Sequence, residues 1–273
     1  MSKALALSHG AFGRAAIYAL NRTITTHAHR EGHLIFNIAD TPSMARVGRT
    51  DVLCDARTAA AVSPWEPHSF HPLSVEAALV LVLYIKPMWF LEHTNSAEFA
   101  LSFGTKRLAL TPDISHLVRR LSVLMMEDSS ALEVEALLFD LTRRCYGHSW
   151  KTATERPCRM PRPRLSDYRV RRSQKLMRDC VCDAQGVDAI AAEVGLSRPH
   201  FFKLFKQQTG VTPNIYFNTL RSEQAIEDLT ASAKSVTEIG LDLGFSSQAS
   251  FTRFFSLNVG ISPTDYRRAA QVH

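Results

Sequence analysis

The stretch from Gly186 to Arg268 decides the fold of the C-terminal half, because it contains one pattern twice. The first copy starts at Val187 and reads VDAIAAEVGLSRPHFFKLFKQQTGVTPNIYF. The second starts at Val236 and reads VTEIGLDLGFSSQASFTRFFSLNVGISPTDYR. The glycines that follow the first apolar segment lie 49 residues apart, whereas the glycines at the end of the second segment lie 50 apart. The second copy therefore carries one extra residue after its first glycine.

Each copy predicts a helix, a tight turn and a second helix. In the first copy, Val187, Ile190 and Val194 recur at helical spacing. Gly195 can adopt the left-handed conformation that ends a helix, and Ser197 is a good N-cap for the next one. Two short helices joined in this way form a helix-turn-helix, whose second helix can enter the major groove of DNA. Two such units in register are a far more specific signal than one.

The last hundred residues resemble the DNA-binding domain of the AraC/XylS family of bacterial transcription regulators. The resemblance rests on both helix-turn-helix units and on a closing motif formed by Arg253, Phe255, Gly260, Pro263, Tyr266 and Arg267. Ser256 departs from the family pattern, in which a lysine is usual, so one phosphate contact is expected to be missing. The resemblance also implies that the helix between the units, with Thr212 as its cap and Pro213 in its first turn, holds the two recognition helices about one DNA turn, roughly 34 Å, apart.

The first recognition helix is predicted to bury an apolar stripe and to turn its other face to DNA. The buried stripe consists of Phe201, Leu204 and Phe205. The outward face consists of Arg198, Pro199, Phe202, Lys203 and Lys206. The resemblance implies that Pro199, Phe202 and Lys203 occupy base-reading positions. Because two of these are apolar, we expect this helix to read thymine methyl groups or DNA shape, with a core position as the alternative for Phe202.

The second recognition helix presents more polar groups. Its inward residues are Phe251, Phe254 and Phe255. Its predicted DNA-facing residues are Gln248, Ala249, Ser250, Thr252 and Arg253. Gln can bond adenine twice and Arg can bond guanine twice, so Gln248 and Arg253 are predicted to be the specific pair. The alternative for Arg253 is a phosphate contact. Arg221, in the connecting helix, matches a family arginine and is assigned structural support or a phosphate contact.

Charge and cysteine usage agree with a DNA-binding role. Residues 1–150 contain 14 Lys/Arg and 14 Asp/Glu, whereas residues 151–273 contain 18 and 12, so the net charge of +6 resides in the C-terminal part. The five cysteines are odd in number and form no C-x-x-C pair, which argues against a disulfide framework or a zinc finger. The apolar segments are too short for a membrane helix, and the N-terminus lacks a signal-peptide core. We expect a cytoplasmic protein that does not bind membranes.

The N-terminal part is predicted to be an antiparallel β-structure followed by two helices. Apolar, partly β-branched runs begin at His33 and Val75, and shorter candidates are ARVGR and RTAAAVS. No long amphipathic segment separates these runs, so a parallel sheet is unlikely to form and a small sandwich or barrel is expected. Amphipathic helices are predicted over 112–128 and 130–146, the second with Leu132 on its buried face. This order resembles the cupin-like sensing half of AraC/XylS regulators, whose trailing helices often pair two subunits.

Histidines in this N-terminal part form a candidate ligand pocket. The predicted pocket residues are His27, His29, His33, Trp65 and His68. In cupins, an H-x-H pair and a later histidine converge on a divalent metal, which makes His27, His29 and His68 an alternative metal set, with Glu31 and Glu66 as possible added ligands. The usual Glu and Gly spacing of a cupin metal motif is not kept. The expectation is therefore a metal-free ligand pocket, with merely structural histidines as the remaining alternative, and no cofactor or catalytic residues.

The sequence as a whole predicts an α+β protein with two domains. A cupin-like effector-sensing and dimerisation domain spans residues 1–150, a Pro- and Arg-rich linker spans 151–165, and a double helix-turn-helix domain spans 166–273. The expected function is sequence-specific transcription regulation in response to a small-molecule effector. The expected partners are double-stranded promoter DNA, the effector, a second copy of the chain, and RNA polymerase if the protein is an activator. The alternative is a metal-dependent cupin enzyme fused to a DNA-binding domain.

Overall fold

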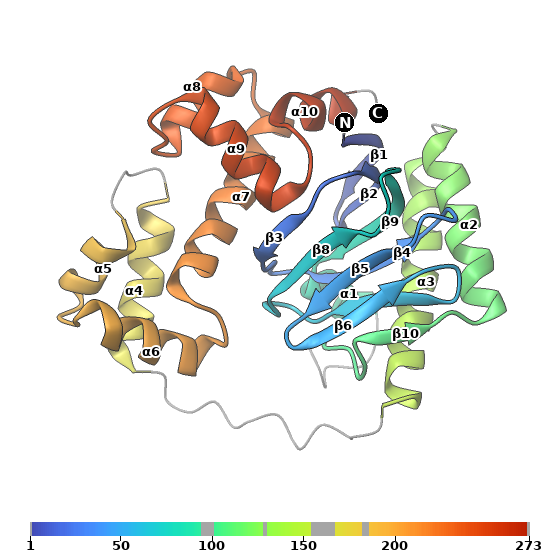
Figure 1. The fold of residues 1–273 in the computed structure, drawn as a ribbon, viewed down its shortest axis with the longest axis horizontal. Helices are drawn as coiled ribbons and strands as arrows, with labels where there is room; N and C mark the ends of the chain where they lie inside the picture. Colours follow the sequence, from blue (N-terminus) through green and yellow to red (C-terminus); the bar gives the residue numbers. More distant parts are fainter. Residues whose placement is uncertain (1, 94–100, 128–129, 154–166, 182–185, 272–273) are drawn as a thin grey trace.

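The fold consists of an N-terminal β-domain and a C-terminal helical domain that pack against each other (Figure 1). The structure is a computed structural model, and it describes residues 2–93, 101–127, 130–153, 167–181 and 186–271. Most of the predicted linker lies outside the described residues. Among the described residues, no helix combines the length and the apolar character needed to cross a membrane.

The N-terminal domain contains two antiparallel sheets that face each other. The larger sheet has the order β1-β2-β9-β4-β7-β10 and the smaller has the order β3-β8-β5-β6. Their bounds are β1 Lys3–Gly10, β2 Gly13–Leu20, β3 Ile24–His27, β4 Gly32–Asn37, β5 Ser43–Val47, β6 Thr50–Cys54, β7 Thr58–Val62, β8 His68–Pro72, β9 Ala78–Ile85 and β10 Arg107–Ala109. Every strand pair is antiparallel, as predicted.

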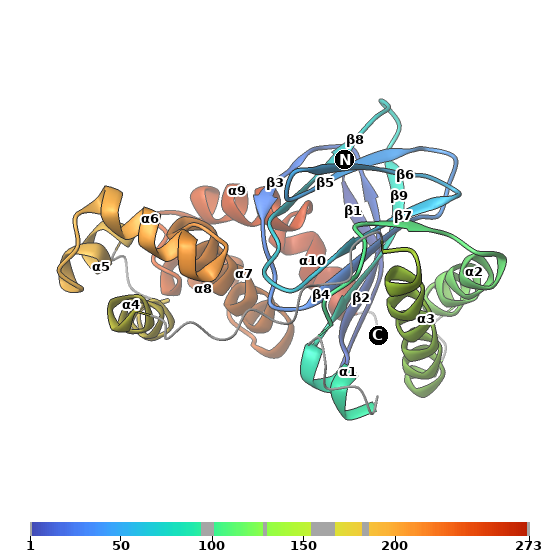
Figure 2. The same ribbon diagram turned by 90° about the horizontal axis from the view of Figure 1, so that it is seen from below.

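The larger sheet lies between two apolar cores, which explains its nearly continuous apolar strands. In β9, Val80, Val82 and Tyr84 belong to the core inside the β-domain, whereas the alternate residues Leu81 and Leu83 belong to the core under the helices. The second core is covered by α1 Pro87–His93, α2 Pro112–Met126 and α3 Ala131–Lys151, which lie on one side of the sheet (Figure 2). Strands buried on both faces lose the alternation that marks a half-exposed strand.

The two helices after the strands confirm the prediction with one correction. Leu138 and Leu141 of α3 are buried, as are Ile114 and Leu121 of α2. Leu132 was expected on the buried face of α3 but is 79% exposed. It lies in the first turn of α3, before Val134, which is the first buried residue of the helix.

The C-terminal domain consists of seven helices within the described residues. They are α4 Tyr168–Asp179, α5 Val187–Glu193, α6 Arg198–Thr209, α7 Pro213–Ala231, α8 Val236–Asp242, α9 Gln248–Val259 and α10 Pro263–Gln271. The long helix α7 connects the α5–α6 unit to the α8–α9 unit (Figure 1). Thr212 caps α7 by accepting a hydrogen bond from the backbone of Ile215, as predicted.

The two domains share one continuous apolar core. Residues of the β-domain interior, such as Leu20 and Ile24, and residues of the helical domain, such as Ile261, belong to the same buried cluster. Polar contacts accompany this packing. They comprise a bond of 2.9 Å from Thr219 Oγ1 to the Ala28 carbonyl, an ion pair of 2.9 Å between Arg30 and Glu223, and stacking of Trp65 on Tyr216 with ring centroids 4.7 Å apart. A change inside the β-domain can therefore reach the helical domain through direct contacts.

Candidate DNA interface

Both predicted helix-turn-helix units are present, and the two turns differ by one residue. Val194–Ser197 is a turn of four residues between α5 and α6, whereas Leu243–Ser247 is a turn of five between α8 and α9. Gly195 has φ of 70°, in the left-handed region that allows the sharp turn. Ser247 forms a capping box with Ser250, which fixes the start of α9. The extra residue thus extends the turn and leaves both recognition helices twelve residues long.

The outward face of α6 is basic and partly aromatic. Lys203 and Lys206 are exposed, as is Pro199. Phe202 is half-buried and packs against the core, and the Arg198 guanidinium lies 5.1 Å from its ring centroid. Arg198 also pairs with Asp188 of α5. Exposed ion pairs contribute little stability, so Arg198 can exchange this partner for a phosphate at small cost.

The outward face of α9 carries the predicted base-reading pair. Gln248 and Arg253 are exposed. The Gln248 side-chain oxygen accepts a bond of 2.7 Å from Thr237 Oγ1 of α8, which orients its amide and leaves the NH₂ group outward. The second lone pair of this oxygen and the NH₂ group remain for the two bonds to adenine. The Ser250 hydroxyl donates to the Ser247 carbonyl at 2.7 Å, so its first role is to cap the helix.

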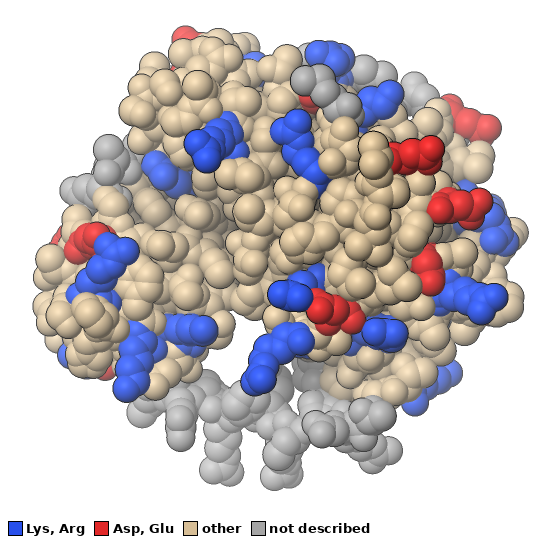
Figure 3. Space-filling model, viewed as in Figure 1, with Lys and Arg blue, Asp and Glu red and all other residues tan. Residues whose placement is uncertain are grey.

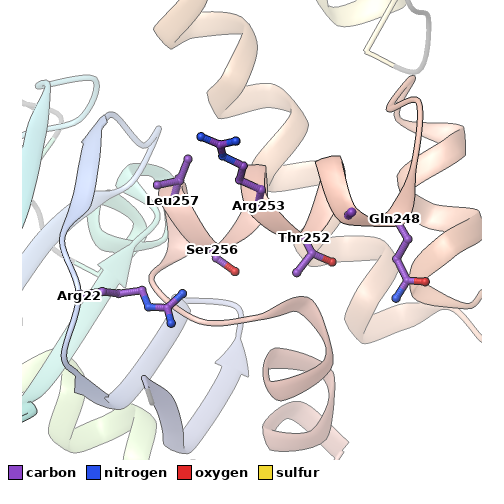
Figure 4. Close-up of a pocket in the computed structure, with 7 residues that line it drawn as sticks. Arg22, Gln248, Thr252, Arg253, Ser256 and Leu257 are labelled. Carbon is purple, nitrogen blue, oxygen red and sulfur yellow. The ribbon is translucent and has the colours of Figure 1, made fainter.

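Arg22 of the N-terminal domain shares a hollow with α9. The hollow has a volume of about 690 Å³ and is lined by Arg22, Gln248, Ala249, Thr252, Arg253, Ser256 and Leu257. Figure 4 shows Arg22 extending from the turn between β2 and β3 toward the α9 side chains Thr252 and Ser256. Thr25 Oγ1 donates a bond of 3.0 Å to the Leu257 carbonyl and joins β3 to the same helix. The candidate interface therefore contains a cation from the other domain.

Sequence reasoning missed Arg22, because nothing in a local pattern marks it. It lies 226 positions before Gln248, and only the packing of β3 on α9 brings the two together. Figure 3 shows that basic side chains are spread over the helical domain on this face, whereas acidic side chains gather mainly over the β-domain. An anionic ligand would meet Arg22 together with the basic residues of the helical domain.

Arg221 has a structural position. Its guanidinium lies 4.4 Å from the ring centroid of Phe245 and donates to the Leu243 carbonyl. Both partners belong to the turn between α8 and α9. Of the two roles that the sequence left open, support of the turn is the one that this geometry provides.

Four of the five predicted pocket residues come together inside the β-domain. His27 and His68 are register partners on β3 and β8, and their ring centroids lie 4.3 Å apart. His29 and His33 lie 5.2 Å and 4.8 Å from His68, measured between ring centroids. Burial lowers the pKa of all four histidines, and that of His68 falls to about 4. At neutral pH the cluster is therefore uncharged.

Trp65 and the two predicted acidic ligands lie outside the histidine cluster. The Trp65 ring stacks on Tyr216 of α7, and only its backbone N–H reaches the cluster segment, by donating to the His29 carbonyl at 2.7 Å. Glu66 pairs with Lys106 at 2.6 Å. Glu31 lines a separate hollow with Arg14 and Glu223. The prediction of Trp65 as a neighbour of the histidines was based on proximity in sequence, whereas its ring is directed to the domain boundary.

Comparison with known proteins places the C-terminal helices in a known family. A model described as a helix-turn-helix domain matches residues 190–269. The transposon Tn10 TetD protein of Escherichia coli is 38% identical over 82 residues, which are 30% of this chain and 59% of TetD. RhaS of E. coli O139:H28, a transcriptional activator of the HTH type, is 38% identical over 92 residues, which are 34% of this chain and 33% of RhaS. The C-terminal domain is a helix-turn-helix domain of the AraC type.

The likeness outside this AraC-type domain concerns the fold. The chain spans less than two thirds of the length of TetD and about a third of RhaS. A crystal structure of ToxT from Vibrio cholerae matches 93% of this chain and 94% of its own, with a TM-score of 0.58 and 15% identity. The fold of nearly the whole chain, a β-domain followed by helices, is thus seen in a solved structure.

Proposed function

We propose that this protein binds promoter DNA sequence-specifically and regulates transcription. The observation that carries the proposal is the pair of exposed recognition helices in an AraC-type domain, each supported by a buried aromatic stripe. Helix α6 offers mainly cations and an aromatic ring, which suit phosphates and thymine methyl groups. Helix α9 offers Gln248 and Arg253, whose side chains can form paired bonds with adenine and guanine.

We further propose that a small molecule bound by the N-terminal domain controls DNA binding. A hollow of about 440 Å³ at the domain boundary supports this, because it is lined by Arg14 and Lys86 of the β-domain and by Glu223 and Thr230 of α7. A ligand there would touch both domains at once. The ToxT structure that shares this fold contains an unsaturated fatty acid, so the fold can accommodate an organic ligand.

The remaining partners follow from the same proposal. Helices α2 and α3 expose the apolar side chains of Val123, Met126 and Leu132, which would suit pairing of two copies of the chain. We propose a cytoplasmic location, because promoter DNA is the proposed partner and the buried, unbridged thiols of Cys54 and Cys145 suit a reducing compartment. Contact with RNA polymerase would apply if the protein is an activator.

Three matched variants test the DNA interface by fluorescence anisotropy on specific and random duplexes. Arg253→Ala should weaken binding to the preferred sequence by about 1–3 kcal/mol and leave binding to random DNA almost unchanged. Lys206→Ala should weaken both equally and reduce the salt slope by about one. Arg143→Ala is the control, since Arg143 is exposed on α3 of the β-domain and pairs with Asp140. Equal losses on all duplexes for Arg253→Ala would make that residue a phosphate contact.

A further inference from the structure

The buried histidine cluster has the donor set of a metal site. One nitrogen from each of His27, His29 and His68 lies within 4.8 Å of the others. The three residues are 7%, 7% and 2% exposed. In a tetrahedral zinc site with Zn–N distances of about 2.0–2.1 Å, ligand nitrogens lie roughly 3.3 Å apart. The ligand nitrogens therefore need to approach one another by up to about 1.5 Å, which side-chain rotations can supply.

The backbone fixes which nitrogen of two of these rings can bind a ligand. The Thr25 carbonyl accepts from His27 Nδ1 at 2.6 Å, and the Glu66 carbonyl lies 3.0 Å from His68 Nδ1. With Nδ1 protonated, Nε2 carries the lone pair. Metal-binding histidines almost always donate their second ring N–H to such an acceptor, which orients the ring. The cluster thus has the outer hydrogen bonds of a metal site as well as its inner nitrogens.

Several buried ring nitrogens of the cluster lack a hydrogen-bond partner among the described residues. Within the described part of the chain, no hydrogen bond reaches the buried Nε2 atoms of His29 and His68, or either ring nitrogen of His33. A buried acceptor without a partner is unfavourable, and so many together in one protein interior call for an explanation.

We propose that His27, His29 and His68 bind a divalent first-row transition metal, with zinc as the representative ion. Three imidazoles suit zinc, copper, nickel or iron, whereas calcium and magnesium require oxygen ligands. The fourth position is left for water or a small anion, which would also offset the added positive charge near Arg14. The site is internal to the β-domain and distinct from the hollow proposed for an organic effector.

The position of this site connects it to the recognition helix. His27 and His29 lie in the segment 24–29, which also carries the Thr25 hydroxyl that donates to Leu257 of α9 and the Ala28 carbonyl that accepts from Thr219 of α7. Closing the histidines around an ion would pull on this same segment. On the basis of the proposed function, metal occupancy is therefore expected to change DNA affinity.

Binding is tested on the full chain after removal of metal with a chelator and alkylation of accessible thiols. Calorimetric titration with Zn²⁺ should give one ion per chain, and Co²⁺ should give the visible absorption of a tetrahedral nitrogen site. His29→Ala and His68→Gln should each weaken binding by more than the roughly 10–100-fold that loss of an outer hydrogen-bond partner causes. His71→Ala is the matched control, because His71 lies on the same strand as His68 but bonds to Ser69 at 3.0 Å outside the cluster.

Two results would overturn the metal site: no binding by the wild type, or equal binding by the wild type and both cluster variants. Melting curves of the metal-free proteins show whether each variant folds, and Zn²⁺ should raise the melting temperature of the wild type and of His71→Ala only. DNA affinity is then measured with and without Zn²⁺. If Zn²⁺ binds but does not change DNA affinity, the proposed coupling between metal and DNA binding is wrong, whereas the metal site itself stands. A chain that binds Zn²⁺ but no DNA under any condition would reject the proposed function instead.

Discussion

Gly260 gives a quantitative test of the contact between the two domains. It follows α9 with φ of 91° and ψ of −13°, and a Cβ atom there would lie 2.8 Å from Ile24 Cδ1 and 3.1 Å from Leu20 Cδ2 of the β-domain. Gly210, after α6, has nearly the same backbone, with φ of 81° and ψ of −17°, but a Cβ atom there would meet nothing within 4 Å. The two glycines have nearly the same backbone conformation. They differ in that only Gly260 faces side chains of the β-domain.

The expected free energies of unfolding follow from this difference. Gly210→Ala should destabilise by about 1–2 kcal/mol through the left-handed backbone alone. Gly260→Ala should add about 1 kcal/mol, at the lower end of typical overpacking, because the atom it meets is the end of a flexible side chain. Ile24→Val removes that atom but leaves Leu20 Cδ2 at 3.1 Å and the Cγ1 atom of residue 24 at 3.2 Å, so the excess should shrink, without vanishing, in the double variant Gly260→Ala/Ile24→Val.

Urea unfolding of the full chain, as a double-mutant cycle, measures the excess. We expect Gly260→Ala and Ile24→Val to be coupled by roughly half of this excess, about 0.5 kcal/mol, and Gly210→Ala and Ile24→Val to be additive. If both pairs were additive and both glycine variants lost the same stability, α9 would not be docked on β3. The β-domain would then have no direct contact through which to act on the recognition helix α9.

Three further predictions concern Arg22, Arg221 and Glu223. Arg22→Ala should reduce the salt slope of DNA binding by about one and leave the preferred sequence unchanged; an unaltered slope would remove Arg22 from the interface. Arg221→Met should lower the free energy of unfolding by about 1–3 kcal/mol, because the Leu243 carbonyl loses its hydrogen-bond donor. Calorimetric melting measures this loss, and a melting temperature equal to that of the wild type would contradict the structural role of Arg221. Burial, assisted by Glu31, raises the pKa of Glu223 from 4.5 to about 7, so the folded chain retains this proton to a higher pH than the unfolded chain. Stability should therefore decrease as pH rises from about 4.5 through 7, and Glu223→Gln should flatten this decrease in urea titrations; an identical pH profile would show that Glu223 ionises normally.

The helical domain was predictable from sequence because its signals are local. A glycine turn, a capping serine and an apolar stripe at helical spacing each act within a few residues. The turns and stripes are present in both units, and Ser247 caps α9, whereas Ser197 occupies the N-cap position of α6 without a side-chain cap bond. The orientation of α9 residues toward solvent followed from the buried positions of Phe251 and Phe255. Such patterns report on one helix at a time, and each helix here follows its own pattern.

The β-domain was only partly predictable because its strands depend on distant partners. The runs that became β4 and β9 were recognised by their apolar content, but the hairpin β1–β2 was not, since β2 is buried on both faces and shows no alternation. The histidine cluster was anticipated from the H-x-H spacing, whereas the direction of Trp65 depended on Tyr216, 151 positions later. Arg22 had no local signal of any kind.

Selection of binding sites from a random duplex library tests the central claim most directly. The wild-type chain should enrich a motif with two elements about one DNA turn apart, one for each recognition helix. Arg253→Ala should lose preference at a single position of one element and keep the other element intact. Failure of the wild-type chain to enrich any sequence, with or without Zn²⁺, would contradict the proposal that α6 and α9 read DNA.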